Sequence, residues 1–339
     1  MKEYSRKEQL SFDDILLVPQ VSDIKSRKDV SLSTTLGAGL ELSIPIIAAP
    51  MDTVCEEGMA LAMSKQGGLG IIHRYMPIDN QVEKIEIARQ GKGIVGGSVG
   101  ATGTFLSDAE RLVDAGATLV LVDVANGHSQ HAINAVSDLR GHFGEFIHIM
   151  AGNVANWDGF ARLTDAGANS IRVGIGGGSA CTTRVVSGHG VPTLASIMDI
   201  RERVGYEDAP ALIADGGIRN SGDAAKALAA GAHAVMVGRL LAGTTESPGE
   251  VLEGYKVFRG MASREAQEAG RGAVSGVEGV STRVPFVGSV DSIINDFKNG
   301  LRSALSYTGV DNLIDFQLDS MYNKVSSNSL QETKPHAKE

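Results

Sequence analysis

Short apolar stretches alternate with helix-like stretches along most of this chain. Each apolar stretch is four to six residues long and rich in Val, Ile, Leu and Ala, which is typical of a buried strand. Eight such stretches occur, at 45–50, 69–73, 94–99, 119–124, 147–151, 171–175, 211–214 and 234–237. The pattern therefore predicts eight strands separated by helices.

Three of the intervening segments carry clear helix boundaries. We expect helices over 107–116, 156–167 and 220–231, with Ser107, Asn156 and Asn220 at their N-caps. Each segment ends on Ala-Gly-Ala, and a glycine at that place is a common helix terminus. The helices thus end just before the fourth, sixth and eighth predicted strands.

Eight strands alternating with helices favour a (β/α)8 barrel, with a doubly wound open sheet as the alternative. No Pro/Ser-rich linker divides the chain, so we expect one domain over 1–324. The polar, non-periodic segment 325–339 is expected to be a disordered tail. In a barrel the chemistry lies at the carboxyl ends of the strands, so the residues that follow each strand are the ones to inspect.

Composition narrows the possible functions. The chain has 339 residues and a net charge of −9, which argues against nucleic-acid coating and against an anionic-membrane anchor. No apolar run approaches the ~20 residues of a membrane span, and the polar N-terminus does not resemble a signal peptide. Two cysteines, Cys55 and Cys181, exclude a disulfide framework, so we expect a cytoplasmic protein.

The sixth strand is followed by a glycine-rich loop that contains Cys181. Glycines here allow backbone N–H groups to approach an anion, and Ser179 could add a hydroxyl. Arg184, three residues beyond Cys181, could favour a nucleophilic thiolate. Ser179 stands where a dinucleotide fingerprint needs its third glycine, so no Rossmann site is predicted. Cys55, by contrast, is expected to be an inert core residue at a helix start.

Other strand ends also carry polar groups. Asp215 follows the seventh strand and could accept hydrogen bonds from a ribose, and the loops after strands seven and eight often hold a phosphate in barrels. Asp123 and Asn153 follow the fourth and fifth strands. The segment 259–280, charged and glycine-bearing, could cover the barrel mouth or form an ordinary surface loop.

Taken together, the segments 176–184, 51–54, 215–217 and 259–261 resemble the IMP dehydrogenase/GMP reductase family. The resemblance extends from about residue 10 to 315. It implies a (β/α)8 barrel, a homotetramer, a purine 5′-monophosphate substrate and a nicotinamide cofactor. Phe258 stands where the family usually has a phosphate-contacting Tyr, and Arg239 replaces a small residue.

The resemblance also implies a role for individual residues. Cys181 would attack C2 of the purine, and Thr183 and Glu278 would relay protons. Substrate contacts would come from Ser179, Asp215, Gly216, Gly217, Gly238, Arg239, Arg259, Gly260 and Met261. Asp123 and Asn153 would contact the cofactor. The carbonyls of Gly176, Gly178 and Cys181 match the family's loop for a monovalent cation such as K⁺.

Two features separate the branches of the family. Family dehydrogenases usually insert a regulatory domain between strands two and three, but here one helix-like segment joins residue 76 to residue 94. They also carry a longer flap with an Arg-Tyr pair, which is absent between Gly260 and Glu278. The resemblance therefore implies NADPH-dependent conversion of GMP to IMP and ammonia through a cysteine thioimidate. The alternatives are NAD-dependent oxidation of IMP to XMP, or nucleotide binding without catalysis, which Phe258 and Arg239 motivate.

Overall fold

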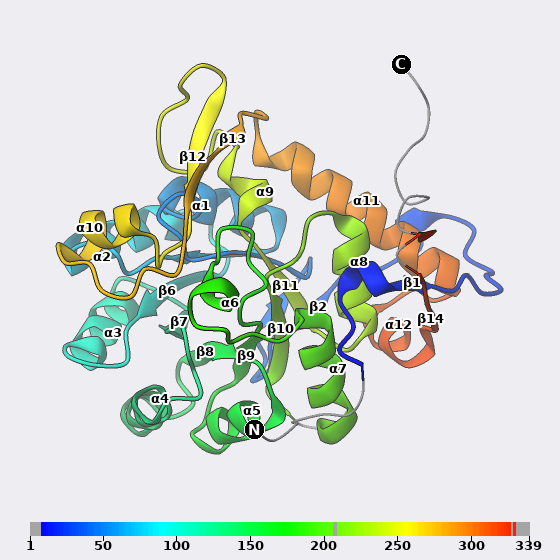
Figure 1. The fold of residues 1–339 in the computed structure, drawn as a ribbon, viewed down its shortest axis with the longest axis horizontal. Coiled ribbons are helices and arrows are strands. Elements are labelled where there is room, and N and C mark those ends of the chain that lie inside the picture. The colour runs from blue at the N-terminus through cyan, green and yellow to red at the C-terminus, as the bar shows by residue number, and fades with distance from the viewer. Residues whose placement is uncertain (1–7, 206–208, 327, 330–339) are drawn as a thin grey trace.

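The computed structural model describes residues 8–205, 209–326 and 328–329, and its centre is a closed barrel of eight parallel strands (Figure 1). The strands pair in the order β10-β11-β4-β5-β6-β7-β8-β9, and the last pairs with the first. They are β4 (Ile46–Ala48), β5 (Leu69–Ile72), β6 (Val95–Val99), β7 (Leu119–Asp123), β8 (His148–Val154), β9 (Ser170–Val173), β10 (Ala211–Asp215) and β11 (Ala234–Val237). The closed ring confirms the (β/α)8 barrel and excludes the open sheet.

Helices surround the strands (Figure 1). The outer layer consists of α1 (Glu57–Gln66), α2 (Ile78–Arg89), α3 (Phe105–Asp114), α4 (Gln130–Phe143), α5 (Trp157–Asp165), α7 (Thr193–Val204), α8 (Ser221–Ala229) and α11 (Val290–Thr308). Asn156 and Asn220 cap α5 and α8 by accepting the N–H of Gly159 and Asp223, as expected. Between β5 and β6 the chain forms α2 alone.

Two helix starts differ from the sequence expectation. Helix α3 begins at Phe105 after Thr104, not at Ser107. The Thr104 hydroxyl bonds the Asp108 carboxylate at 2.8 Å, and Ser107 donates to the Thr104 carbonyl, so Ser107 is already within the first turn. Likewise α1 begins at Glu57, so Cys55 precedes this helix.

The core has two parts, because alternate strand residues point to opposite sides of the barrel. Side chains such as Ile47, Leu121 and Met236 belong to a cluster inside the ring. A hairpin of β2 (Thr34–Thr35) and β3 (Glu41–Leu42) adds Leu36 and Leu42 to that inner cluster. The second and larger cluster lies between the strands and the helices. Both clusters are buried, which fixes the strand ends rigidly.

The two ends of the described chain meet on the outside of the barrel. The first elements are the 3₁₀ turn η1 (Phe12–Asp14), β1 (Ile15–Leu17) and η2 (Arg27–Asp29). Strand β1 pairs antiparallel with β14 (Tyr322–Lys324), which follows α12 (Leu313–Asp319). The N–H of Val325 donates to the Asp14 carbonyl at 2.9 Å. Of the predicted tail, 327 and 330–339 lie outside the described residues.

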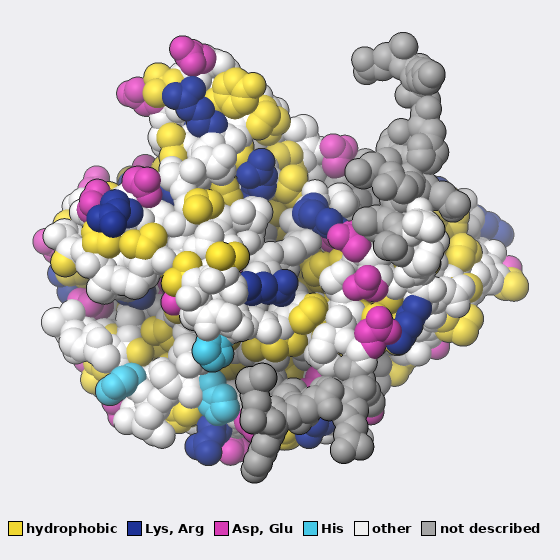
Figure 2. All heavy atoms as spheres, in the orientation of Figure 1, with side chains coloured by type: hydrophobic (Ala, Val, Ile, Leu, Met, Phe, Trp, Pro, Cys, Tyr) yellow, Lys and Arg dark blue, Asp and Glu magenta, His cyan; other side chains and the backbone are white. Residues whose placement is uncertain are grey.

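A separate two-stranded antiparallel sheet lies beside the barrel mouth (Figure 1). It consists of β12 (Tyr255–Arg259) and β13 (Ser281–Pro285), with α10 (Arg264–Arg271) between them. The short helices α6 (Thr183–Val186) and α9 (Arg239–Ala242) follow β9 and β11. Basic and acidic side chains are mixed on the face that Figure 2 shows. In the described part of the chain, no helix has both the length and the apolar character needed to cross a membrane.

Candidate active site

Most of the residues expected to carry chemistry lie at the carboxyl ends of the barrel strands or on the segments that follow them. Cys181 is exposed on the loop after β9, and α6 starts two residues later. Its thiol donates to Thr183 Oγ1 at 3.2 Å, and the Thr183 hydroxyl donates to Glu278 Oε2 at 2.7 Å. A thiol, a hydroxyl and a carboxylate are therefore connected in series, although Glu278 is 95 residues from Thr183. Such a chain can carry a proton to or from the sulfur.

Backbone hydrogen bonds bring Glu278 to the cysteine loop. The Thr182 N–H donates to the Glu278 carbonyl at 2.9 Å, and the Val280 N–H donates to the Ala180 carbonyl at 3.0 Å. Gly260 is pressed against the same loop, where an added Cβ would lie 2.8 Å from the Ala180 carbonyl oxygen. The segment 259–280 is thus joined to the cysteine loop by its main chain.

Contrary to expectation, the Arg184 side chain does not contact the Cys181 thiol. Its guanidinium donates to the Val191 carbonyl at 3.1 Å, and its side chain lies against Gly176 and Gly190. The glycines leave a groove in which the Arg184 stem packs. The hydrogen-bond partner of Cys181 is therefore Thr183 and not a cation.

An arginine that the sequence analysis did not select links two of the expected acidic residues. Arg172, on β9, donates to Asp123 Oδ1 at 2.6 Å and to Asp215 Oδ2 at 2.8 Å. Burial acts to lower the pKa of Arg172, but the two carboxylates outweigh it and the net shift is upward. A charged residue within the predicted strand 171–175 was the sequence signal for this role.

Asp215 was expected to be free to bind a ribose, but one of its two carboxylate oxygens is already hydrogen-bonded within the protein. Its Oδ2 accepts hydrogen bonds from Arg172 and, at 2.8 Å, from the Asn153 amide. The Asn153 amide also donates to the Gly174 carbonyl. These bonds use Oδ2 and leave Oδ1 of Asp215 and the amide oxygen of Asn153 for a ligand. Arg74, another unselected residue, donates to the Asp123 carbonyl at 3.0 Å.

The glycines expected to surround a phosphate pack closely against their neighbours. Gly216 has φ +93° and lies on Gly177 and Gly178, where a Cβ would approach the backbone to 3.0 Å. Gly217 has φ +86° and lies on the ring of Phe12. Such φ values favour glycine. Three of the remaining substrate residues are partly open: Ser179 and Arg239 are exposed, and Gly238 precedes α9.

Arg259 and Met261 form hydrogen bonds with Asp52, on the loop after β4. The Arg259 guanidinium bonds Asp52 Oδ2 at 2.9 and 2.5 Å, and Met261 Sδ accepts from the Asp52 N–H at 3.3 Å. These side chains therefore hold two loops together, and Gly260 joins them to the cysteine loop. Phe258 is buried just before them.

The backbone carbonyls suggested for a monovalent cation belong to Gly176, Gly178 and Cys181. Carbonyl oxygen is a suitable ligand for a hard cation. The Gly178 carbonyl also accepts the Cys181 N–H at 3.1 Å, so the loop is already curved around its own backbone. Carbonyl oxygens are the donor type that an ion such as K⁺ takes, so the chemistry of these three groups is compatible with such an ion.

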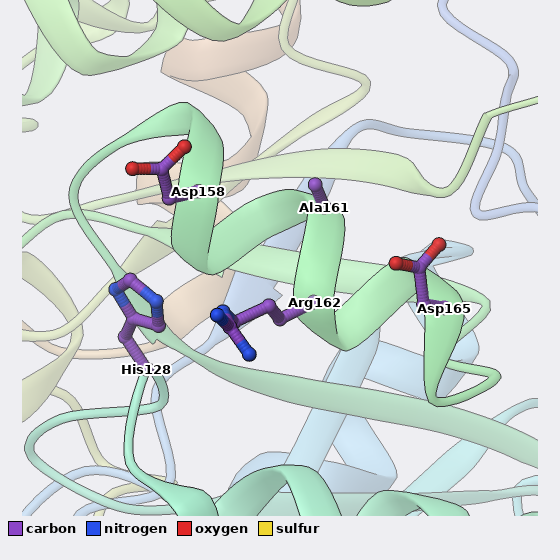
Figure 3. A pocket seen from close by; sticks show the side chains of 5 residues that line it. All are labelled: His128, Asp158, Ala161, Arg162 and Asp165. Atoms are coloured by element: carbon purple, nitrogen blue, oxygen red, sulfur yellow. The ribbon is translucent and has the colours of Figure 1, made fainter.

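Cys55 and one surface pocket lie apart from this site. Cys55 is fully buried, and burial raises the pKa of its thiol strongly, so it is the unreactive cysteine. The pocket is formed by His128 and residues of α5 (Figure 3). None of its lining residues is among those expected to act on a substrate.

The fold and the site together define a (β/α)8-barrel enzyme arranged around an exposed cysteine. A family model described as the IMP dehydrogenase / GMP reductase domain matches residues 9–336. The chain therefore belongs to the IMP dehydrogenase/GMP reductase family and is an oxidoreductase.

Several relatives show how far the similarity extends. The inosine-5′-monophosphate dehydrogenase of Nitrosopumilus maritimus is 32% identical, with 97% of this chain and 98% of the relative aligned. That of Borreliella burgdorferi is 33% identical, with 97% of each chain aligned. Among solved structures, a cysteine-to-alanine variant of GMP reductase from Trypanosoma brucei, in complex with guanosine 5′-monophosphate, is 29% identical. It superposes with a TM-score of 0.91 over 99% of each chain.

Proposed function

We propose that this protein is a GMP reductase, which converts GMP, NADPH and two protons to IMP, NADP⁺ and ammonium. The observation that carries the proposal is the series Cys181–Thr183–Glu278, with hydrogen bonds of 3.2 and 2.7 Å. The reaction needs a nucleophile and a proton for the departing amine, and this series has a group for each.

The first half of the reaction removes ammonia. The Cys181 thiol gives its proton through Thr183 to Glu278, and the sulfur forms a bond to C2 of the purine. Glu278 returns that proton through Thr183 to the 2-amino group, the C2–N bond breaks, and ammonia leaves. The product is a thioimidate between Cys181 and the purine, with all atoms accounted for.

The second half reduces the thioimidate. NADPH would supply the hydride that C2 accepts. The C2–S bond to Cys181 would then break, IMP would leave, and the Cys181 thiolate would take a proton from solvent. Asp123 and Asn153 would contact the cofactor. Arg172 connects Asp123 to Asp215, which is the proposed ligand of the substrate ribose. The two proposed nucleotide sites would therefore be adjacent, as hydride transfer requires. K⁺ on the carbonyls of the cysteine loop would keep that loop in shape.

Substrate binding would use the glycine loops. The purine nucleotide's phosphate would lie against Ser179, Gly216–Gly217 and Gly238–Arg239, and Oδ1 of Asp215 would accept from the ribose. The Trypanosoma brucei reductase, which was solved with GMP, supports a purine monophosphate as the ligand. In this chain Arg259 and Met261, which bond Asp52, would hold the loop after β4 against the segment 259–280 beside the substrate.

The second candidate is IMP dehydrogenase, which the names of the curated relatives favour. That reaction must hydrolyse the thioimidate and needs a base for the attacking water. In this chain the short segment after Gly260 forms α10, where Arg264 pairs with Glu268 on the exposed surface. Because that arginine faces solvent, the reductase is the better supported of the two.

We further propose that the catalytic unit is a single barrel over 1–324 with no inserted regulatory domain. The alignment with the Nitrosopumilus relative spans 470 positions against 339 residues here, so at least 131 positions have no counterpart in this chain. A cytoplasmic homotetramer is the expected form. Gel filtration with light scattering would test the assembly.

Two assays decide between the reactions. The protein is incubated with GMP and NADPH, and separately with IMP and NAD, and the absorbance of the reduced nicotinamide is followed. We expect NADPH oxidation with one ammonia per IMP formed. Rapid multiple-turnover formation of XMP from IMP would identify a dehydrogenase instead. Binding of nucleotide without either reaction would identify a non-catalytic barrel.

A further inference from the structure

We infer that Phe12 is a positioning residue for the nucleotide-phosphate loop, and that Asp13, Arg219 and Lys226 hold it in place. This inference rests on the proposed function, because it takes the loop 215–217 as the one that receives the nucleotide. The four residues belong to the N-terminal turn η1 and to the segment after β10, which are more than 200 residues apart in the sequence.

Phe12 packs directly against the loop. A Cβ on Gly217 would be 3.2 Å from Phe12 Cε2 and 3.4 Å from Cδ2, so the ring contacts the glycine backbone. Phe12 itself is only 5% exposed. A ring in this place blocks movement of the Gly217 backbone toward η1.

The contact extends to the cysteine loop through the neighbouring glycine. Gly216 packs on Gly177 and Gly178, and a Cβ there would reach the Gly178 nitrogen at 3.0 Å. Phe12, Gly217–Gly216 and Gly177–Gly178 thus form three successive layers, and Ser179 and Cys181 follow in the third. Because two adjacent glycines restrict their own backbone weakly, the loop depends on packing from both sides.

Charged groups fix η1 against the segment after β10. Arg219 donates to Asp13 Oδ2 at 3.0 Å and to the largely buried Asp223 at 2.9 Å. Lys226, on α8, donates to the Phe12 carbonyl at 2.7 Å. Both cations come from residues just beyond Gly217, so the turn and the loop are tied as one unit.

The test compares loss of the whole side chain with loss of the ring alone. Phe12→Ala removes the support, and Phe12→Leu keeps an apolar side chain there. Asp13→Asn weakens the surface pair without opening the core, and Glu8→Gln is the matched control. Glu8 pairs with Lys324 at 3.0 Å in the same N-terminal segment but does not touch the loop.

Binding of GMP and of IMP is measured by titration calorimetry, with kcat and KM where turnover occurs. We expect Phe12→Ala to weaken both nucleotides about 10-fold or more while kcat at saturation changes by less than about 3-fold. Phe12→Leu should recover most of the affinity, Asp13→Asn should lie between, and Glu8→Gln should match the unchanged protein. Thermal melting confirms that each variant is folded.

The outcomes separate this inference from the proposed reaction. Nucleotide affinity unchanged in a folded Phe12→Ala, or a loss shared equally by Glu8→Gln, would overturn it. If Phe12→Ala does not fold, the affinity of Asp13→Asn decides. A protein that binds both nucleotides yet does not oxidise NADPH with GMP would contradict the reductase but leave the positioning role intact. If the unchanged protein bound neither GMP nor IMP, both the positioning role and the proposed reductase would be wrong.

Discussion

Chemistry at the residue scale depends on which of two cysteines can react. Cys181 is exposed and hydrogen-bonded to a hydroxyl, whereas Cys55 is enclosed by the core. The sequence was sufficient to choose between them, since only Cys181 lies on a glycine-rich loop after a strand. Spacing alone suggested Arg184 as the neighbour of the thiol, whereas Thr183 and Glu278 were named only from the family resemblance. Spacing could not separate these residues, because a side chain two or three residues away can face in several directions.

Cys181→Ala should abolish turnover while nucleotide still binds. Loss of covalent catalysis lowers the rate by about 10³-fold or more, because no other group can form the thioimidate. Steady-state kinetics and nucleotide titration measure the two effects. Cys55→Ala is the control and should leave kcat unchanged. Near-normal turnover by Cys181→Ala would refute the nucleophile.

Glu278→Gln should slow ammonia release by about 10²–10⁴-fold, the usual contribution of general acid–base catalysis. The amide keeps the shape of the side chain but cannot hold the proton that Thr183 relays. Ammonia and NADPH are followed together. Glu268→Gln, on exposed α10, changes a carboxylate in the same segment and should have no effect. An unimpaired Glu278→Gln would exclude the relay.

One arginine connects the ends of three barrel strands. Arg172 of β9 bridges Asp123 of β7 and Asp215 of β10. The eight strands and the caps Asn156 and Asn220 were predictable because their signals are local in the sequence. The bridge was not, because its acidic partners lie 49 and 43 residues from Arg172 and only barrel closure brings them together.

Arg172→Gln should lower the free energy of unfolding by about 3–5 kcal/mol, since two carboxylates then remain close together and partly buried without a cation. Urea denaturation measures this change. Arg111→Gln is the control: it breaks the exposed pair with Asp79 and should cost less than about 1 kcal/mol. Equal effects of the two substitutions would show that the bridge does not stabilise the barrel.

At the scale of the whole molecule, two histidines make stability sensitive to pH. Burial and nearby Arg140 lower the pKa of His148 to about 4, and burial with Arg201 does the same for His233. His148 bonds Ser170 at 2.9 Å, and His233 accepts the Leu212 N–H through Nδ1 at 3.0 Å. The folded barrel therefore holds both imidazoles neutral.

The unfolded chain binds these protons near pH 6.5, so stability is fully present above that pH and falls as the pH drops toward 4. Each histidine contributes at most about 3 kcal/mol to this loss. Urea midpoints at pH 7.5, 5.5 and 4.5 measure it. His148→Gln should reduce the slope over this range, and a slope identical to that of the unchanged protein would disprove the assignment.

Because one thiol is exposed and the other is buried, the concentration of folded protein can be measured by thiol titration. A maleimide reagent added to the native barrel should consume one equivalent of thiol, at Cys181, and a second equivalent only after denaturation exposes Cys55. The first equivalent thus measures the concentration of intact sites in any preparation, independent of substrate or direction of reaction. The specific activity of each variant that retains Cys181 can be normalised to that concentration, which separates a slow enzyme from a preparation that contains inactive chains.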